Sequence, residues 1–472
     1  MKQVLIWVGI FLLANAVIAS IGVGLFFWRF VPRIPAADFP TPQDVKEAQE
    51  QDLVHLLNVT NIDYSFSEEA EAEFKHRVAQ LQEMAGTMSD AEFGMEVAAA
   101  VALADNGHTN VSIASLADGL NSLPLRFFWF EDGLHIVRAH AEYEALIGAQ
   151  VVAYDGTPPE ELVAQLRRYQ GGNDAYSRFY SPYFFASPAM MHAVNLANDA
   201  EQVTLTLRLI NGETQELLVP VEENQTETLR VSDHLLAIPF PEETESGNDW
   251  HYFELEAGEQ AHYGMQPDKS LWASDLPNNG FYIRIRLTLD TDDVRLSSWL
   301  ADIQTQLKAS PADYLVLDVR SNPGGDYTKT RRFAQAITAL VKPDGRIYTL
   351  TDNGTFSAGL VTAAFVKHSA GNQGQIVGSQ MADREQFWAE GGGAMTLPNS
   401  GVRVSVSTGY HDWENGCTDW RRCFWPNIFM GVAAGKLDPN IEAPLTFADY
   451  SGGVDTTLEA VFAAEEKFAG TQ

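Results

Sequence analysis

A loop with two adjacent glycines has the residue types that could stabilise a negatively charged oxygen. It runs over residues 318–326 and reads Asp-Val-Arg-Ser-Asn-Pro-Gly-Gly-Asp. Pro323 stiffens the loop, while Gly324 and Gly325 allow backbone N–H groups to point at a docked molecule. Such donors near the start of a helix are what a developing oxyanion requires. A glycine-rich turn with a structural Arg–Asp pair explains the same residues equally well.

A second loop carries a serine that could act as a nucleophile. Ser357 lies where a predicted strand, residues 346–350, turns into a predicted helix, residues 358–369, and the small Ala358 follows it. This placement holds a hydroxyl beside free amides and the positive end of the helix dipole. An ordinary serine N-cap is the commoner explanation of a lone serine before a helix.

Both loops belong to a segment in which strands and helices alternate. Apolar runs predict strands at residues 281–287, 314–319, 346–350 and 375–377, with helices at 293–308, 329–341 and 358–369 between them. This alternation implies crossover connections and a largely parallel, buried sheet. The two loops therefore follow the ends of strands in one sheet.

Taken together, the two loops resemble the serine peptidase family of the C-terminal processing proteases and the tricorn core. The matching strings are residues 280–284, 314–325, 355–358, 376–378 and 397–401. The likeness covers roughly residues 90–465, and the Asn-Pro-Gly-Gly string with its downstream serine is its most specific part. The resemblance implies an α/β crotonase-like (ClpP-like) core and peptide-bond hydrolysis through an acyl-enzyme.

The resemblance also assigns the catalytic roles. Ser357 takes the nucleophile position, and the oxyanion hole uses the N–H of Ala358 with that of Gly324 or Gly325. Because a serine hydroxyl is a poor nucleophile near neutral pH, a base must accept its proton. The processing proteases use a lysine about 25 residues after the serine, but residues 378–387 contain no lysine.

The tricorn-like branch instead uses a histidine from the N-terminal part of the core. Residues 104–111 resemble that segment, so the resemblance makes His108 the base, whereas Arg384 cannot serve because it does not deprotonate. That branch has a serine directly before the histidine, and here Gly107 stands there. It also has a late acidic residue that orients the base. The candidates for that acid, in order of preference, are Glu414, Asp419 and Asp412.

Residues 122–224 look like the PDZ-like module that the family often carries. They contain short alternating strands and one predicted helix, residues 158–169, and residues 147–156 are similar to the strand and turn of that module. A PDZ-like module suggests recognition of a C-terminal carboxylate, although this segment has no clear glycine-rich carboxylate loop.

The N-terminus contains an uncharged apolar stretch of 24 residues, Val4–Phe27. At about 1.5 Å per residue it is long enough to cross a bilayer core about 30 Å thick. Cleaved signal peptides have shorter apolar regions, so the stretch predicts an uncleaved transmembrane anchor; Ala14-Asn15-Ala16 leaves processing open as an alternative. We expect a single-pass protein of the cell inner membrane with its catalytic body on the periplasmic side.

The chain has 63 acidic and 31 basic residues, a formal net charge of −32, which argues against nucleic-acid binding. Its two cysteines, Cys417 and Cys423, are close enough for a small disulfide loop, with free thiols as the alternative. We expect no metal site, because only His411 lies near them, and no cofactor.

The predicted domains are a transmembrane anchor (1–30), a linker or stalk (31–60), an N-terminal helical part of the core (61–121), the PDZ-like module (122–224), an irregular acidic connector (225–275) and the α/β peptidase core (276–472). The favoured function is a membrane-anchored serine endopeptidase of the carboxy-terminal processing type, acting on peptides or unfolded polypeptides. The alternatives are a catalytically degenerate relative that binds peptides or an apolar ligand, and an esterase or amidase.

Overall fold

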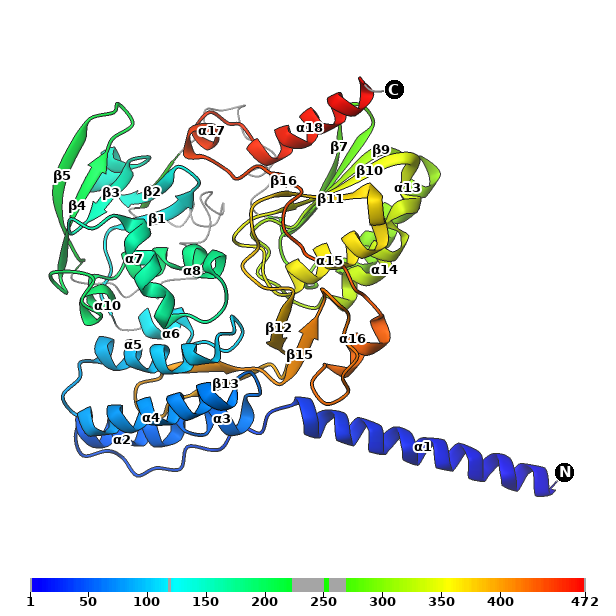
Figure 1. Cartoon of the computed structure of the whole chain (residues 1–472), viewed down its shortest axis with the longest axis horizontal. Helices are drawn as coiled ribbons and strands as arrows, with labels where there is room; N and C mark the ends of the chain where they lie inside the picture. Colours follow the sequence, from blue (N-terminus) through cyan, green and yellow to red (C-terminus); the bar gives the residue numbers. More distant parts are fainter. Residues whose placement is uncertain (1, 118–119, 223–249, 254–268, 471–472) are drawn as a thin grey trace.

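The computed structural model describes residues 2–117, 120–222, 250–253 and 269–470. A β-rich lobe and an α/β lobe lie side by side, and a layer of helices from the N-terminal part of the chain runs beneath the β-rich lobe (Figure 1). The glycine-rich loop at residues 318–326 and the loop that carries Ser357 both belong to the α/β lobe.

The α/β lobe is built on a six-stranded sheet of order β16-β11-β10-β9-β8-β7. All neighbouring strands are parallel except β7 and β8. The strands are β7 (Leu271–Leu276), β8 (Gly280–Ile285), β9 (Ala312–Asp318), β10 (Val341–Thr351), β11 (Gly374–Gly378) and β16 (Ile441–Glu442). The predicted alternating segment is thus a largely parallel sheet.

Helices cover both faces of this sheet because successive strand residues point to opposite sides. Leu315 and Leu317 of β9 pack in one apolar cluster with α13, α14 and α15, whereas Tyr314 and Val316 pack in another with α18. The helices are α13 (Leu296–Ala309), α14 (Thr328–Ala336), α15 (Ala358–Ala370) and α18 (Thr456–Ala469). Burial on both faces explains why the strands read as continuous apolar runs.

The β-rich lobe is an antiparallel sheet of order β1-β2-β3-β4-β5, with β6 added beside β2. Its strands are β1 (Leu125–Phe130), β2 (Gly133–His140), β3 (Gln150–Tyr154), β4 (Gln202–Arg208), β5 (Thr214–Pro220) and β6 (Trp250–Tyr252). The helix α7 (Pro159–Leu166) confirms the predicted one, and three further helices lie between it and β4. These are α8 (Asp174–Tyr180), α9 (Pro182–Phe185) and α10 (Pro188–Ala193).

The helical layer consists of α2 (Val45–Leu56), α3 (Val59–Ile62), α4 (Glu68–Met84), α5 (Asp90–Val101) and the short α6 (Ile113–Ala117). Helix α5 begins at Ser89, whose side chain and that of Glu92 form a reciprocal capping box. Helices α2 and α3 correct the predicted linker over residues 31–60. Asp44 caps α2 and Leu53 is fully buried, so the packed structure begins well before residue 60.

Two short antiparallel strand pairs complete the fold, and one of them, from the predicted α/β core, packs with the predicted N-terminal helical part. Strands β13 (Gly393–Thr396) and β14 (Arg403–Val406) pair with each other and pack in the same apolar cluster as the helical layer. Strands β12 (Gln386–Ala389) and β15 (Gly409–Asp412) pair near α16 (Trp425–Met430). The predicted 225–275 connector falls mostly outside the described residues, and β7 begins within its last residues.

Helix α1 (Lys2–Phe30) projects from the body, with the N-terminus at its far end (Figure 1). Most side chains of residues 1–18 lie outside the described set. Within the described residues, no helix has the length and apolar character of a membrane span. The last turn of α1 packs on the body, since Phe30 is buried against Phe424 and Trp425.

Candidate active site

Ser357 occupies a strained position between β10 and α15. Its backbone has φ 51° and ψ −121°, a positive φ that non-glycine residues seldom adopt. Its side chain makes no capping hydrogen bond with α15. The ordinary N-cap explanation of this serine is therefore wrong. The hydroxyl is held at the start of a helix without being used to cap it.

The serine loop is fastened to the glycine loop by hydrogen bonds of the residues before Ser357. The Phe356 N–H donates to the Asn322 carbonyl oxygen at 2.9 Å, and the Thr355 hydroxyl donates to the Val319 carbonyl oxygen at 2.8 Å. Asp352 accepts the backbone N–H of Ser321 at 2.7 Å. The two loops that the sequence singles out thus form one rigid unit at the carboxyl ends of β9 and β10.

The amides predicted for an oxyanion hole are not equivalent. The N–H of Gly324 donates to the side-chain oxygen of Asn322 at 2.9 Å, so it is already used. The N–H groups of Gly325 and Ala358 have no hydrogen-bond partner within the described part of the chain. Of the three candidate amides, those of Gly325 and Ala358 are therefore the ones not engaged by the described residues.

Gly324 is required at its position for a steric reason. Its φ is 124°, and a Cβ atom there would lie 2.7 Å from the Cβ and 3.0 Å from the Oγ of Ser357. Real Cβ contacts are essentially never shorter than 3.0 Å. Glycine thus permits the close approach of this loop to the serine hydroxyl.

Arg320, at the start of the glycine loop, belongs to a buried network of ion pairs. Arg320 forms hydrogen bonds with Asp318 and a bidentate pair, 2.7 and 2.8 Å, with Asp455 at the start of α18. Burial, the largest effect, raises the pKa of Asp318, but Arg320 and Arg284 outweigh it and hold that pKa well below its usual range. The structural Arg–Asp pair therefore exists in this loop, and the oxyanion-hole role of its amides stays a prediction.

His108 lies beside the serine loop, although 249 positions separate the two residues in the sequence. Its ring stacks on Phe356, the neighbour of Ser357, with 4.4 Å between ring centroids. The loop that carries it is fixed by Asn106, whose side chain donates to the Trp388 carbonyl oxygen at 3.0 Å and accepts the Trp388 N–H at 3.2 Å. His108 is thereby tied to strand β12.

The carboxylate next to His108 belongs to Asp383. Its Oδ2 lies 3.0 Å from His108 Nε2, and the two side chains are 3% and 16% exposed, respectively. Because a carboxylate accepts and does not donate, we place the ring proton on Nε2. That assignment leaves Nδ1 as the nitrogen able to accept the proton of a serine hydroxyl.

The structure does not bring the three predicted acids to His108. Glu414 lies 3.2 Å from the ammonium of Lys436 and accepts a hydrogen bond from Gln386. Asp412 accepts the N–H of Asn415, and the exposed Asp419 accepts the N–H of Arg421. The expectation of an acid among residues 412–419 is corrected: the paired carboxylate, Asp383, precedes β12.

The rings around His108 form a continuous stack. His108 lies between Phe356 and Phe387, and its ring centroid is 5.0 Å from that of Phe387, nearly parallel to it. On the other side of Phe387, His411 stacks at 4.6 Å. This stack restricts the imidazole of His108 to one orientation, which a base that must face a fixed hydroxyl requires.

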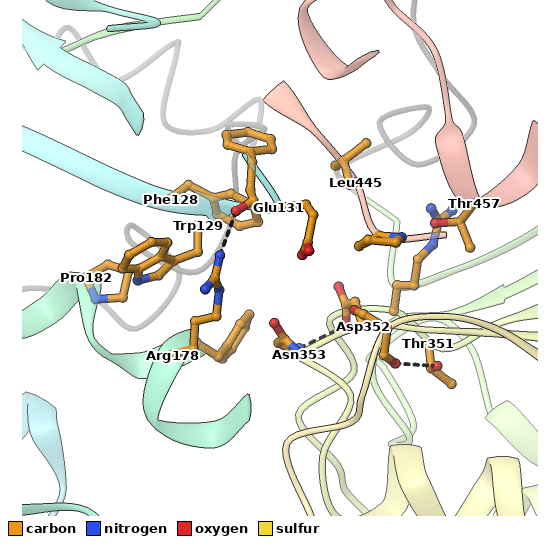
Figure 2. Close-up of a pocket in the computed structure, with 16 residues that line it drawn as sticks. Phe128, Trp129, Glu131, Arg178, Pro182, Thr351, Asp352, Asn353, Leu445 and Thr457 are labelled. Atoms are coloured by element: carbon orange, nitrogen blue, oxygen red, sulfur yellow. Dashed lines mark hydrogen bonds between the residues drawn. The ribbon is translucent and has the colours of Figure 1, made fainter. Parts of the chain in front are cut away.

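Ser357 and His108 line one cavity of about 440 Å³. Its wall also contains a cluster of side chains beyond the predicted site, namely Tyr327, Glu390, Arg403 and His411. A separate, smaller pocket lies between β1, α8 and the loop of Asp352 and Asn353, and Figure 2 shows its wall. There Arg178 donates to the Phe130 carbonyl oxygen at 2.9 Å.

The cysteines and the acidic side chains do not form a metal site. Cys417 and Cys423 are joined by a disulfide. Within the described ranges, no group of three or more His, Cys, Asp or Glu residues is arranged to hold a metal ion.

No protein-family model and no curated protein matches this sequence. Among solved structures, CPAF complexed with lactacystin aligns with a TM-score of 0.52 and 15% identity, covering 87% of this chain and 96% of CPAF. The CPAF structure with a serine-to-alanine mutation aligns with a TM-score of 0.55 and 15% identity, covering 87% and 95% of the two chains.

A photosystem II D1 C-terminal processing protease also aligns, at 13% identity over 87% of this chain and 98% of that protein, but its TM-score of 0.36 supports no inference. CPAF is a member of the C-terminal processing family of serine peptidases. At 15% identity the likeness establishes the fold alone. The chain therefore has the fold of CPAF, a C-terminal processing peptidase, and the family resemblance predicted from its sequence is confirmed at the level of the fold.

Proposed function

We propose that this chain is a serine peptidase of the carboxy-terminal processing type, which cleaves peptide bonds through an acyl-enzyme on Ser357. One observation carries the proposal. A serine in a strained helix-start position, with its hydroxyl not used as a cap, shares a cavity with a histidine that is paired to a carboxylate. In this assignment the α/β lobe is the crotonase-like core and the antiparallel lobe is the PDZ-like module.

The reaction begins when Nδ1 of His108 accepts the proton of the Ser357 hydroxyl. The serine oxygen attacks the carbonyl carbon of the scissile bond, and the resulting oxyanion accepts hydrogen bonds from the N–H groups of Gly325 and Ala358. Asp383 stabilises the imidazolium that forms. The imidazolium then gives its proton to the leaving amine, and a water molecule repeats the sequence to release the acid and the free serine.

The test is covalent labelling with a fluorophosphonate, followed by mass-spectrometric mapping of the labelled residue. We expect label on Ser357 in the wild type and none in Ser357→Ala. Peptide hydrolysis in that variant should fall by about 10⁴–10⁶ in turnover while its melting temperature stays within a few degrees. A properly folded wild type that neither takes up the label nor cleaves peptides would favour the degenerate, binding-only alternative. Cleavage of esters but not of peptides would favour an esterase.

For location, we propose that α1 anchors the chain in the inner membrane with the catalytic body on the periplasmic side. The support is the uncharged 24-residue stretch of the sequence and the aromatic cluster where α1 meets the body. Trp420 and Phe429 beside that cluster and Trp28 on α1 are 53%, 71% and 68% exposed, as side chains at a membrane surface would be. Fractionation and protease accessibility of the full chain in spheroplasts test the proposal, and full-length protein recovered in the soluble fraction would refute it.

A further inference from the structure

Glu390 places a carboxylate in the wall of the cavity that holds Ser357. It directly follows strand β12 and has a φ of 63°, in the left-handed region. This backbone conformation costs a non-glycine residue conformational free energy. Such residues persist where the surrounding structure holds them, often at ligand sites. The next three residues, 391–393, are glycines, which adopt a positive φ without steric cost. The chain nevertheless has a glutamate, and not a glycine, at the strained position.

The surrounding residues fix one oxygen of this carboxylate and not the other. Oε1 accepts the Tyr327 hydroxyl at 3.3 Å and lies 3.4 Å from Nε2 of His411. The methylene groups of Glu390 pack on Gly409, where an added Cβ atom would come within 3.1 Å of the Cγ of Glu390. Oε2 has no partner in the described part of the chain, and the side chain is 26% exposed at the cavity wall.

The carboxylate is held in its ionised form. Burial, the largest effect, raises the pKa of Glu390, but the neighbouring His411, with smaller effects of Tyr327 and His108, outweighs it and lowers that pKa below its ordinary value. A ligand of opposite charge would give Oε2, which faces the cavity, a charge-assisted partner in place of water.

We propose that Glu390 is a subsite for a cationic side chain of the substrate, lysine or arginine, next to the scissile bond. The proposal rests on the peptidase function proposed above and names its substrate class. An arginine fork or a lysine ammonium can reach the unused Oε2, and a charge-assisted hydrogen bond in a mostly buried site is among the stronger polar contacts.

The other charge in the cavity wall does not cancel this preference. Arg403 is the one basic side chain besides the histidines among the residues that line the cavity, and it is exposed to solvent. A charge open to water is screened more strongly than one held at a buried wall. Glu390 is the one acidic side chain among the described residues that line the cavity, so it is the carboxylate that a cationic substrate group would meet there.

The experiment is cleavage of a proteome-derived peptide library by the full chain, with mass spectrometry of the cleaved ends. We expect the wild type to show lysine and arginine enriched at one position beside the cleaved bond. In Glu390→Gln, the ratio of kcat/KM for basic over neutral side chains at that position should fall by about tenfold or more. Glu390→Lys should turn the preference toward acidic side chains, and Glu390→Asp should retain part of the basic preference.

The matched control is Glu414→Gln, the same chemical change at a carboxylate that does not line this cavity. It should leave the ratio unchanged. Fluorophosphonate labelling of Ser357 in each variant verifies that the site is assembled. Labelled, active enzyme with the same ratio in wild type and Glu390→Gln would overturn the subsite alone. A wild type that is neither labelled nor active would overturn the peptidase function, and the subsite with it.

Discussion

Replacing Asp383 by asparagine tests whether this residue orients the base. In the wild type, Oδ1 accepts the N–H of Arg384 at 3.0 Å and Oδ2 faces Nε2 of His108 at 3.0 Å. In Asp383→Asn the remaining oxygen can keep the Arg384 amide, which turns the NH₂ group toward His108. That NH₂ donates, so Nε2 must accept and the ring proton moves to Nδ1. Nδ1 is the nitrogen that must take the proton of Ser357, so the variant holds the wrong tautomer.

The size of the effect follows from the charge that is lost. The imidazolium exists only after proton transfer, and unit charges about 4 Å apart at an effective dielectric constant of about 20 attract by about 4 kcal/mol. Since about 1.4 kcal/mol corresponds to a tenfold change in rate, kcat should fall by about 10³. Because Asp383 is not in contact with bound peptide in this mechanism, KM should change by less than about threefold.

The assay is steady-state hydrolysis of a library-derived fluorogenic peptide, with melting temperatures measured for each variant. Glu414→Gln serves as the control and should keep kcat within about threefold of the wild type, because Glu414 pairs with Lys436 and not with His108. The reasoning is refuted if Asp383→Asn stays active while Glu414→Gln loses activity. In that case the acid predicted from the sequence would orient the base after all.

Three further outcomes follow from the geometry. Gly324→Ala should abolish labelling of Ser357, because the added methyl carbon would lie 2.7 Å from the serine Cβ; a labelled variant with wild-type stability would contradict this. Replacing both Cys417 and Cys423 by serine should lower the unfolding free energy in urea by about 2 kcal/mol, the chain-entropy value for so short a loop, and an unchanged midpoint would disprove it. The lowered pKa of Asp318 contributes stability that is present above pH about 4 and lost as the pH falls below it. Asp318→Asn should therefore flatten the loss of urea stability between pH about 5 and about 3, and an equally steep loss would argue against this contribution.

The α/β sheet could be predicted from the sequence because its signals are local. A run such as Tyr314–Val319 is apolar on both faces, is too short for a free helix, and becomes β9 with Leu315 and Leu317 on one side and Val316 on the other. Ser357 was also found from local information, a strand followed by a small residue and a helix. Its backbone strain supports that interpretation but cannot be read from residue types.

The helices α8 to α10 were not predicted from the sequence, and two of them begin at prolines. Pro182 and Pro188 occupy the first turns of α9 and α10, where the missing N–H would have had no helical partner. The side chain of Ser187 accepts the N–H of Met190 and caps the second of these helices. A serine directly before a proline was therefore the sequence signal for the start of each of these two helices.

Asp383 was missed for a different reason, since its role depends on tertiary pairing. It lies in the stretch that was searched for a lysine, residues 378–387, and an aspartate there has no local signature. A usable clue was topological: the chain leaves β11 beside the carboxyl end of β10, so the next residues must lie near the serine loop. Glu414 was favoured on resemblance alone, and its interaction with Lys436 could not be seen without coordinates.

The short strand β12 positions several residues of the candidate site. Asp383 lies just before β12, Phe387 lies within it between two imidazoles, and Glu390 follows it at the cavity wall. The pairing of β12 with β15 sets Phe387 opposite His411, and a slip by one residue would turn Phe387 to the other face. Such a slip would remove the ring that holds His108 in place and move the carboxylate that we assign to substrate cations. We therefore expect base orientation and substrate selection to be coupled through the pairing of β12 with β15, although the proposed nucleophile, Ser357, follows a different strand, β10.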